Sequence, residues 1–529
     1  MFLKKIRQIH IDKGFLLCLV LSLTILVVFF GKLLLHPNST FFGTSGDAIL
    51  VYYNSLYHTL HNKELLTESA MFYPYSESIF FTSCMPILTQ FIKLFFLQNY
   101  TIGIINLFML FSMPAGAIFL YLIFKEYKVN MLFAVFSAVA IAYLSPQIHR
   151  LTGHYNLSYV FAIPASIWLM IKYIKNPSYK KSIVIGVYCF FLATMHMYLF
   201  IFTVAIITFA WISTLFTKKF TISIKQYIIN YFIQIIFPFL ILQLLIYVVN
   251  TSDARTNSPW GFFDYYSNLN GIFYSKNEFY SPLFKLLQLD GNVNYEGEAF
   301  VGIAAFFFCM ALILKSVINL LMLKPLAIFN PTGNKFLNFI LLISLICLIF
   351  SFCIPYKYGY ENLLDYLGFL KQFRALGRFT WLFFYVINIC LIICISNISE
   401  QYNKFYFKSI LMIFVVGFIS YDAFSNINDF QNQINYSYPE WTDTQNQNAN
   451  NVWVKEIDPD KYQAILPFPY FQVGSENLGT VVVEHYFTGR CLLLPVNKDS
   501  LNLQFKVVSP AASMFGKTLL SITITESIS

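Results

Sequence analysis

Asp47 is the first residue of this sequence whose type and position suggest chemistry. It lies in Ser45-Gly46-Asp47-Ala48, shortly after a long apolar run. Glycine lets the chain turn there, and a carboxylate within hydrogen-bond reach of a sugar or lipid hydroxyl can act as its general base. The structural alternative is a helix N-cap, because an apolar periodic stretch follows directly. The two roles can coexist.

A pair of arginines supplies the complementary charge. Arg374 and Arg378 lie in the segment 373–381, directly before a later apolar run. Four residues apart on a helix, they would share one face, and their planar guanidinium groups suit phosphate. We therefore expect them to bind a lipid-linked phosphate or pyrophosphate. Anchoring to ordinary lipid head groups is the alternative.

A short polar segment, residues 145–156, lies between two apolar runs. It carries His149, Arg150 and His154, which could bind a phosphate or a sugar hydroxyl. Two histidines five residues apart do not share one helical face, so the spacing does not favour a metal pair. An interfacial polar turn is the alternative interpretation.

Aromatic residues form a further candidate surface at Phe72-Tyr73-Pro74-Tyr75, followed by Glu77. We interpret Tyr73 and Glu77 as contacts for a carbohydrate or a polyprenyl chain. An interfacial aromatic belt with a proline turn is the alternative. The nine cysteines form no CxxC pair, which argues against a zinc site or a disulfide framework. No metal ligand is assigned and no particular cofactor is predicted, although a divalent cation stays open.

The composition says which kind of element must position these groups. Of 529 residues, 57% are hydrophobic and only 12% are charged, with a mean hydropathy of +0.61. This mixture cannot cover a soluble surface, and a disordered chain would need the opposite balance. The net charge of +9 comes from short dispersed clusters, which argues against nucleic acid as a partner. The sequence predicts an all-α polytopic membrane protein.

About 20 apolar residues are needed to cross the hydrocarbon core. The sequence predicts about eleven such spans, near residues 15–35, 102–124, 131–145, 157–174, 182–197, 198–216, 227–249, 299–322, 336–354, 379–397 and 408–422. The region 182–216 could hold two short helices or one long bent helix. In the first case Met195-His196-Met197-Tyr198 would be the turn.

The cations give the spans an orientation. About 16 lysines and arginines fall in the short connections on one side, against about 9 in the much longer connections on the other. We therefore expect a multi-pass protein of the inner (plasma) membrane with a cytoplasmic N-terminus. Most carboxylates fall in the opposite, outer loops, and none lies inside a predicted helix. This argues against a proton- or ion-driven pump.

The outer connections are long enough to hold structure of their own. The transmembrane region is expected at 1–425, with outer loops at 36–101, 145–156, 250–298 and 355–378. Residues 48–65 could form an amphipathic helix on the membrane surface. An Asn/Gln-rich linker is expected at 426–451. A small β-containing extracytoplasmic domain is then expected at 452–529; it ends directly after a strand-like run, so we expect it to be incomplete.

Together these motifs resemble the bacterial branch of the GT-C membrane glycosyltransferases, including large bacterial membrane proteins related to YfhO-type proteins. The resemblance covers most of residues 15–425 and depends on the order of the Asp47, Tyr73, His149–His154 and Arg374–Arg378 segments. It implies a GT-C-like fold. It also implies that Asp47 activates the acceptor and that Arg374 or Arg378 contacts the donor phosphate.

The favoured hypothesis is therefore a glycosyltransferase of the outer face. It would pass a sugar from a polyprenyl-phosphate donor to an envelope lipid, glycan or protein, with His149 or His154 lining the pocket and membrane lipids around it. A transporter or flippase of lipid-linked substrates is one alternative, and it needs polar groups near mid-membrane, of which His196, Gln234 and Gln243 are candidates. A non-catalytic scaffold of envelope assembly is the other.

Overall fold

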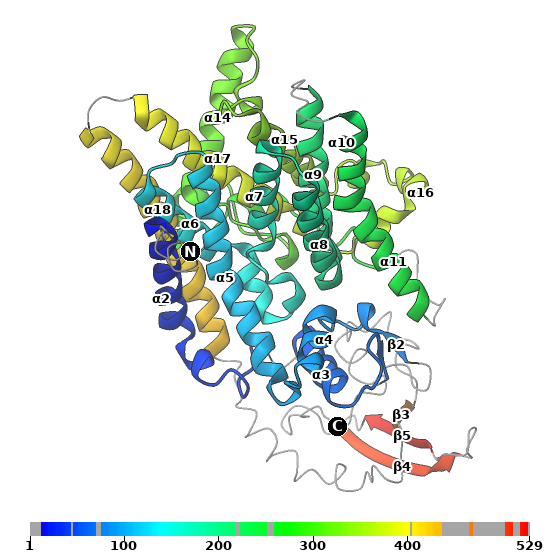
Figure 1. Cartoon of the computed structure of the whole chain (residues 1–529). Helices are drawn as coiled ribbons and strands as arrows, with labels where there is room; N and C mark the ends of the chain where they lie inside the picture. Colours follow the sequence, from blue (N-terminus) through cyan, green and yellow to red (C-terminus); the bar gives the residue numbers. More distant parts are fainter. Residues whose placement is uncertain are drawn as a thin grey trace, which may run out of the picture.

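The computed structural model describes residues 12–43, 46–69, 76–216, 223–250, 259–401, 405–435, 465–468, 503–511 and 519–526. In these residues, each predicted span coincides with a helical segment (Figure 1). The segments are α2 (Lys13–Leu35), α5 (Thr101–Glu126), α6 (Met131–Tyr143), α7 (Ala162–Lys175), α8 (Tyr179–Met195), α9 (Met197–Phe216), α10 (Ile224–Tyr231) continuing through the π-helix η5 (Phe232–Ile236) into α11 (Phe237–Val249), α14 (Ile303–Leu321), α15 (Lys335–Ser351), α17 (Thr380–Gln401) and α18 (Phe405–Asn435).

Nine helical segments of the described chain are long and apolar enough to cross a membrane. The helices α8 and α15 have 17 residues each and fall just short of that length. The α8–α9 boundary settles the region 182–216, because His196 has an extended backbone (φ −166°, ψ 133°) and ends α8. Two helices with a turn at this position are thus confirmed, as is the all-α polytopic membrane fold.

Shorter elements fill the long connections. Between α2 and α5 lie α3 (Gly46–Leu60), β1 (Thr67–Glu68), β2 (Glu77–Ser78), η1 (Ile79–Phe81), α4 (Pro86–Leu94) and η2 (Gln98–Tyr100). Between α6 and α7 lie η3 (Pro146–Thr152) and η4 (Tyr155–Leu157). Between α11 and α14 lie α12 (Leu269–Phe273), η6 (Glu278–Tyr280), α13 (Ser281–Leu286) and η7 (Tyr295–Gly297). After α14 come η8 (Ala327–Phe329), η9 (Tyr356–Tyr358), α16 (Leu363–Tyr366), η10 (Gly368–Gln372) and η11 (Leu376–Phe379).

The helix predicted at 48–65 exists as α3, but its surroundings differ from the expectation. Val51, Tyr52, Ser55 and Thr59 are buried, and α3 packs against α4 and α5. These positions recur at helical spacing, so one face of α3 is covered by protein. The helix α3 is therefore a packed part of the domain, and its position at the membrane surface stays a prediction.

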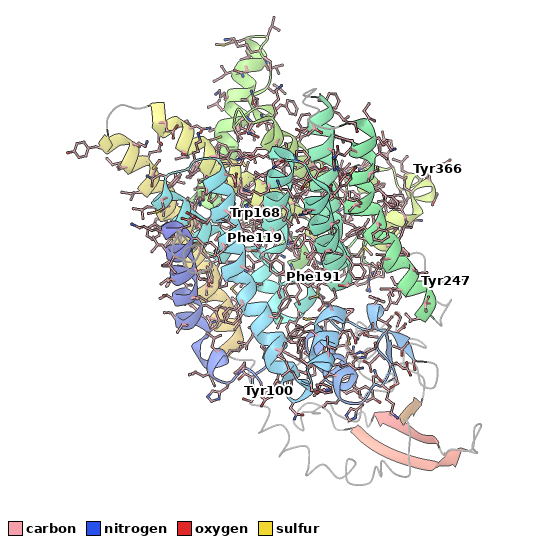
Figure 2. All side chains as sticks on the ribbon, viewed as in Figure 1. Tyr100, Phe119, Trp168, Phe191, Tyr247 and Tyr366 are labelled. Atoms are coloured by element: carbon pink, nitrogen blue, oxygen red, sulfur yellow. The ribbon has the colours of Figure 1, made fainter. Side chains whose placement is uncertain are left out.

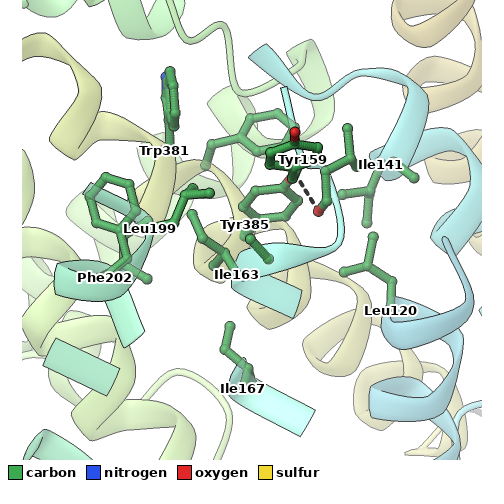
Figure 3. Packing of buried hydrophobic residues seen from close by; sticks show 14 of the residues in the cluster. Leu120, Ile141, Tyr159, Ile163, Ile167, Leu199, Phe202, Trp381 and Tyr385 are labelled. Atoms are coloured by element: carbon green, nitrogen blue, oxygen red, sulfur yellow. Dashed lines mark hydrogen bonds between the residues drawn. The ribbon is translucent and has the colours of Figure 1, made fainter. Parts of the chain in front are cut away.

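The hydrophobic core is built around α17, whose residues from Thr380 to Ile393 are all buried. Figure 3 shows Tyr385 of this helix packed among side chains from α7 and α9. The Tyr385 hydroxyl donates to the carbonyl of Val160 (3.1 Å) and lies 2.8 Å from the Ser145 hydroxyl. Aromatic pairs such as Phe119 and Trp168 (ring centroids 5.6 Å apart) extend the packing along α5 and α7 (Figure 2). The core thus fixes the ends of α6 and α7 against α17.

The last long helix, α18, corrects two expectations. It runs on to Asn435, and Phe430 is fully buried, so the linker expected from 426 does not begin until after Asn435. Asp422 was expected at the end of a span, yet it is buried within α18. Its two carboxylate oxygens accept from the Tyr280 hydroxyl and the Ile303 backbone N–H, both at 2.8 Å. A helix interior therefore does hold a carboxylate, which caps the start of α14.

The two ends of the bundle differ in charge. At one end, which we call the lysine end, Glu126 accepts from Lys172 (2.9 Å) and Lys175 (2.5 Å), and Asp12 pairs with Lys125 (2.7 Å). The opposite end, here called the α3 end, holds α3, α4, η3, η4, η7 and η11. Lysines from two predicted cytoplasmic connections, Lys125 and Lys175, thus lie at the end opposite to α3 (Figure 1). Which compartment each end faces stays a prediction.

Three strands of the C-terminal region are described: β3 (Ile465–Phe468), β4 (Leu503–Ala511) and β5 (Leu519–Glu526). They form a sheet of order β3-β5-β4, parallel between β3 and β5 and antiparallel between β4 and β5. The sequence shows alternating, strand-like runs at 462–466, 480–484 and 519–525. The first and last of these overlap β3 and β5, whereas 480–484 and the linker beyond Asn435 lie outside the described residues.

Candidate functional site

Glu296, in η7, lies at the centre of a buried ionic cluster at the α3 end. Arg378 holds both of its oxygens, with Nε 2.8 Å from Oε2 and one terminal nitrogen 2.5 Å from Oε1. Arg150 approaches from η3, 2.9 Å from Oε2, and also donates to the Tyr295 carbonyl at 2.8 Å. The Glu296 side chain is only 2% exposed. Two guanidinium groups around one carboxylate lower the pKa of Glu296 far below its ordinary value, against the opposing effect of burial.

His154 connects this buried cluster to the surface. Its Nε2 lies 3.1 Å from Glu296 Oε1, and its Nδ1 lies 3.0 Å from Asp47 Oδ2. A neutral imidazole donates from one nitrogen only, so a ring that faces a carboxylate oxygen at each nitrogen is matched by the protonated form. Burial alone would lower the pKa of His154, but its bonds to Asp47 and Glu296 raise it. The Asp47 side chain is 46% exposed, so the chain of contacts extends from the buried cluster to the surface.

We call Asp47, Arg150, His154, Glu296 and Arg378 the charged cluster. When His154 is protonated, the cluster holds three cations and two carboxylates, and so carries one net positive charge. The excess lies in a region of low dielectric, where it attracts an approaching anion more strongly than it would in water. The cluster can therefore hold an anionic group near a solvent-accessible carboxylate.

The glycine at position 377 lets the elements of this cluster approach closely. A Cβ atom added there would lie 2.6 Å from the Cα of Gly297 and 2.7 Å from the carbonyl oxygen of Glu296. The Gly377 N–H donates to the Tyr265 carbonyl at 2.8 Å. Backbone contact between η7 and η11 is thus what brings Glu296 within reach of Arg378.

The two arginines predicted to act together are separated by the structure. Residues 373–375 are not helical, and η11 begins only at Leu376, so Arg374 and Arg378 do not share a helix face. Arg378 is buried against Glu296, and its guanidinium also lies 4.9 Å from the centre of the Tyr198 ring. Arg374 is exposed, and its Nε donates to the Trp260 carbonyl at 3.0 Å. The expectation of one shared face is wrong.

The remaining predicted site residues lie elsewhere. His149 points towards α18, with Nε2 2.8 Å from the amide oxygen of Asn426. Glu77 is buried in β2, where its carboxylate accepts from the Ser78 N–H at 2.8 Å. Tyr73 lies outside the described residues. Asp47 lies in the first turn of α3, after its first residue, so it is not the N-cap; its charge there suits the helix dipole.

Two residues of this region were missed by sequence reasoning. Glu296 was counted only as one of many outer-loop acids, although an arginine pair beside an apolar run demands a counter-charge. His196 was considered as a mid-membrane group and as part of a turn, and not as a neighbour of the charged cluster. It lies at the α8–α9 break, where burial, together with the charges of Arg378 and His154, lowers its pKa to about 3. No pattern in the sequence indicated that these groups meet.

No metal position is formed by the described residues, since no three of their histidine, cysteine or acidic side chains surround a common point. In the charged cluster, His154 instead separates the two carboxylates, one at each ring nitrogen.

Comparison with known proteins places the chain among its relatives. The fold is similar to that of archaeal oligosaccharyltransferase AglB from Archaeoglobus fulgidus in complex with an inhibitory peptide and a dolichol-phosphate, at 13% identity and a TM-score of 0.42, over 85% of this chain and 58% of that one. A structure of the Archaeoglobus fulgidus oligosaccharyltransferase with Zn and sulfate gives 14% identity and a TM-score of 0.43, over 84% and 56%. The chain thus spans less than three-fifths of these proteins.

Among curated proteins, none matches this sequence. The assignment to YfhO-type relatives stays a prediction. A family model, described as Domain of unknown function (DUF6311), matches residues 19–420, well over half of the sequence. The chain therefore belongs to this family.

Proposed function

We propose that the chain is a membrane glycosyltransferase of the GT-C type, which moves a sugar from a polyprenyl-phosphate donor to a hydroxyl of an envelope lipid or glycan. The reaction would take place at the α3 end, which the lysine distribution predicts to face the outside of the plasma membrane. One observation carries the proposal: the half-exposed Asp47 carboxylate is held by His154 beside a cluster with excess positive charge.

The groups of the site suit this transfer. Asp47 would accept the proton of the acceptor hydroxyl while the oxygen of that hydroxyl bonds to the anomeric carbon of the sugar. The bond from that carbon to the phosphate oxygen breaks, and polyprenyl phosphate leaves as an anion. The exposed guanidinium of Arg374 and the positive excess of the charged cluster would stabilise that anion. Arg150 and Arg378 would act indirectly, by fixing Glu296 and through it His154.

The transport alternative loses two of its candidate groups. His196 lies at a helix break in the electrostatic range of the charged cluster. Gln234, in η5, accepts from the Trp211 indole N–H and donates to the Ser182 hydroxyl, both at 3.0 Å. Gln243 is exposed on α11, among large apolar side chains that are exposed as well. These contacts favour a packing role for Gln234 and a role beside the charged cluster for His196, whereas Gln243 is directed away from the interior of the bundle.

The test is transfer by purified protein with radiolabelled polyprenyl-phosphate sugars and envelope lipid extracts. Asp47→Asn should lower the rate by about 10²–10⁴-fold, because it removes the base while keeping the shape of the side chain. The control is Asp365→Asn, whose carboxylate is 70% exposed and pairs with Lys371. If the Asp47 variant retains wild-type activity, Asp47 takes no part in the mechanism. If neither the wild-type protein nor any variant transfers sugar, the non-catalytic scaffold is favoured.

A further inference from the structure

Three aromatic rings form a continuous row beside the charged cluster. The Trp260 and Tyr265 rings meet edge to face, with centroids 5.1 Å apart, and Tyr265 meets Tyr295 in the same way at 6.0 Å. The Tyr295 ring is parallel to the His154 imidazole within 8°, at 6.3 Å. We call Trp260, Tyr265 and Tyr295 the aromatic row. Trp260 is 60% exposed and Tyr295 is 52% exposed, so the row is open to solvent.

Backbone contacts hold the row in place. Gly261 has φ +116°, and a Cβ atom there would lie 2.7 Å from the Arg374 carbonyl oxygen, so only glycine lets this turn approach the segment directly before η11. The carbonyl of Gly261 accepts from the Tyr265 N–H, and the carbonyl of Tyr265 accepts from the Gly377 N–H. The rings are thus fixed by the same elements that assemble the charged cluster, before any ligand arrives.

The row runs between Arg374, which is proposed to bind the donor phosphate, and the His154–Asp47 pair, which is proposed to activate the acceptor. At one end, the Arg374 guanidinium bonds to the Trp260 carbonyl. At the other, the His154 imidazole stacks on Tyr295 and bonds to Asp47. The pKa of the Tyr265 hydroxyl is affected by groups at both ends of the row. Burial and the charges of Glu296 and Asp47 raise this pKa, and the charge of Arg374 lowers it. Tyr265 therefore lies within electrostatic range of both Arg374 and Asp47.

An aromatic belt at the membrane surface would also expose rings, and the chain has such residues. Tyr247 on α11 and Tyr366 on α16 are 82% and 87% exposed and lie at the periphery of the molecule (Figure 2). The aromatic row differs because its rings contact one another and the imidazole that holds Asp47. A belt residue needs no such neighbours.

We propose that the aromatic row is the sugar subsite of this protein, where the pyranose ring of a lipid-linked donor stacks beside the phosphate at Arg374 and within reach of the hydroxyl that Asp47 activates. This rests on the function proposed above. The C–H face of a pyranose is apolar and carries partial positive charge at its hydrogens, so it suits the negative face of an aromatic ring. The tyrosine hydroxyls and the indole N–H can bond to sugar hydroxyls at the ring edges.

The test compares two probes that differ only in the sugar: undecaprenyl phosphate and undecaprenyl-phosphate glucose, with the galactose, mannose and N-acetylglucosamine forms as further probes. Binding to the full-length protein in nanodiscs gives the ratio of the two affinities. Trp260→Ala and Tyr295→Leu should each lower this ratio by roughly tenfold and leave the affinity for undecaprenyl phosphate unchanged. Trp260→Phe should restore most of the ratio, because it keeps a ring.

Tyr366→Ala is the matched control and should leave both affinities unchanged. Thermal unfolding of each variant checks that the fold is intact. An unchanged ratio in Trp260→Ala and Tyr295→Leu, with a wild-type protein that prefers a sugar-bearing lipid, would overturn the sugar subsite alone. A wild-type protein that binds neither undecaprenyl phosphate nor any sugar-bearing form would overturn the proposed function and the subsite with it.

Discussion

Among the described residues of the α3 end, two histidine–glutamate clusters occur, one with a half-exposed carboxylate and one whose histidine and glutamate are fully buried. In the charged cluster, His154 bridges Glu296 and the half-exposed Asp47. In the other, which we call the sealed cluster, His58 lies 3.6 Å from Glu68, and both side chains are fully buried. The amides of Asn62 and Gln90 contact the two ring nitrogens of His58, each at 3.1 Å.

The difference lies in the partners of each histidine. Burial lowers the pKa of His58 to about 4, helped by the charge of Lys93, so the ring is neutral near pH 7 and its contact with Glu68 is not a salt bridge. His154 has two carboxylate partners, which raise its pKa despite burial. A buried, neutral histidine held among amides serves packing, whereas a protonated histidine that contacts a half-exposed carboxylate can serve a ligand.

The strongest test of this contrast removes the same charge from each cluster. Glu296→Gln should destabilise the protein by about 3–5 kcal/mol, because two buried guanidinium groups lose their counter-charge. Glu68→Gln weakens contacts with the neutral Asn62 amide and Cys84 thiol, and should cost about 1 kcal/mol for these two bonds. Thermal unfolding in detergent measures both. Equal losses would mean that the arginines of the charged cluster do not depend on Glu296.

The second test, smaller in effect, addresses the geometry that assembles the charged cluster. Gly377→Ala should cost about 1–3 kcal/mol, because the added methyl group would push η11 away from η7. Gly368→Ala is the control: an added Cβ at Gly368 meets no atom within 4 Å. The loss should also reduce transfer, since Glu296 and Arg378 would separate. If the two variants unfold at the same temperature, the close approach of η7 and η11 does not stabilise the cluster.

Much of the fold could be predicted because it follows from apolar length. Each of the predicted spans coincides with a helical segment, and the break at His196 was one of two stated alternatives. The end of α18 could not be predicted, because its many polar residues are typical of a linker. Only the structure shows that Phe430 and Asp422 are buried. The surroundings of α3 were also missed, because an amphipathic pattern does not say whether lipid or protein covers the apolar face.

The site was predictable in its parts and not in its assembly. Asp47, Arg150 and His154 were each selected for charge and position, and the structure brings them together. Arg378 was predicted to bind the phosphate of a ligand. In the structure its guanidinium group instead binds Glu296, which lies 82 positions away in the sequence. Such pairing depends on tertiary contact between η7 and η11, and no local spacing encodes it.

The smallest expected effect is a pair of opposite pH responses. His58 has a folded-state pKa below the ordinary value of 6.5, so its contribution to stability is present above pH 6.5 and is lost as the pH falls towards 4, by about 1–2 kcal/mol near pH 5. His154 has a raised pKa, so its contribution is complete below pH 6.5 and is lost as the pH rises through the folded-state value. Unfolding temperatures from pH 5 to 9 should therefore flatten on the acid side in His58→Gln and on the alkaline side in His154→Gln. Flattening on the same side in both variants would show that the two histidines share one protonation state, and the contrast between the sealed and charged clusters would fail.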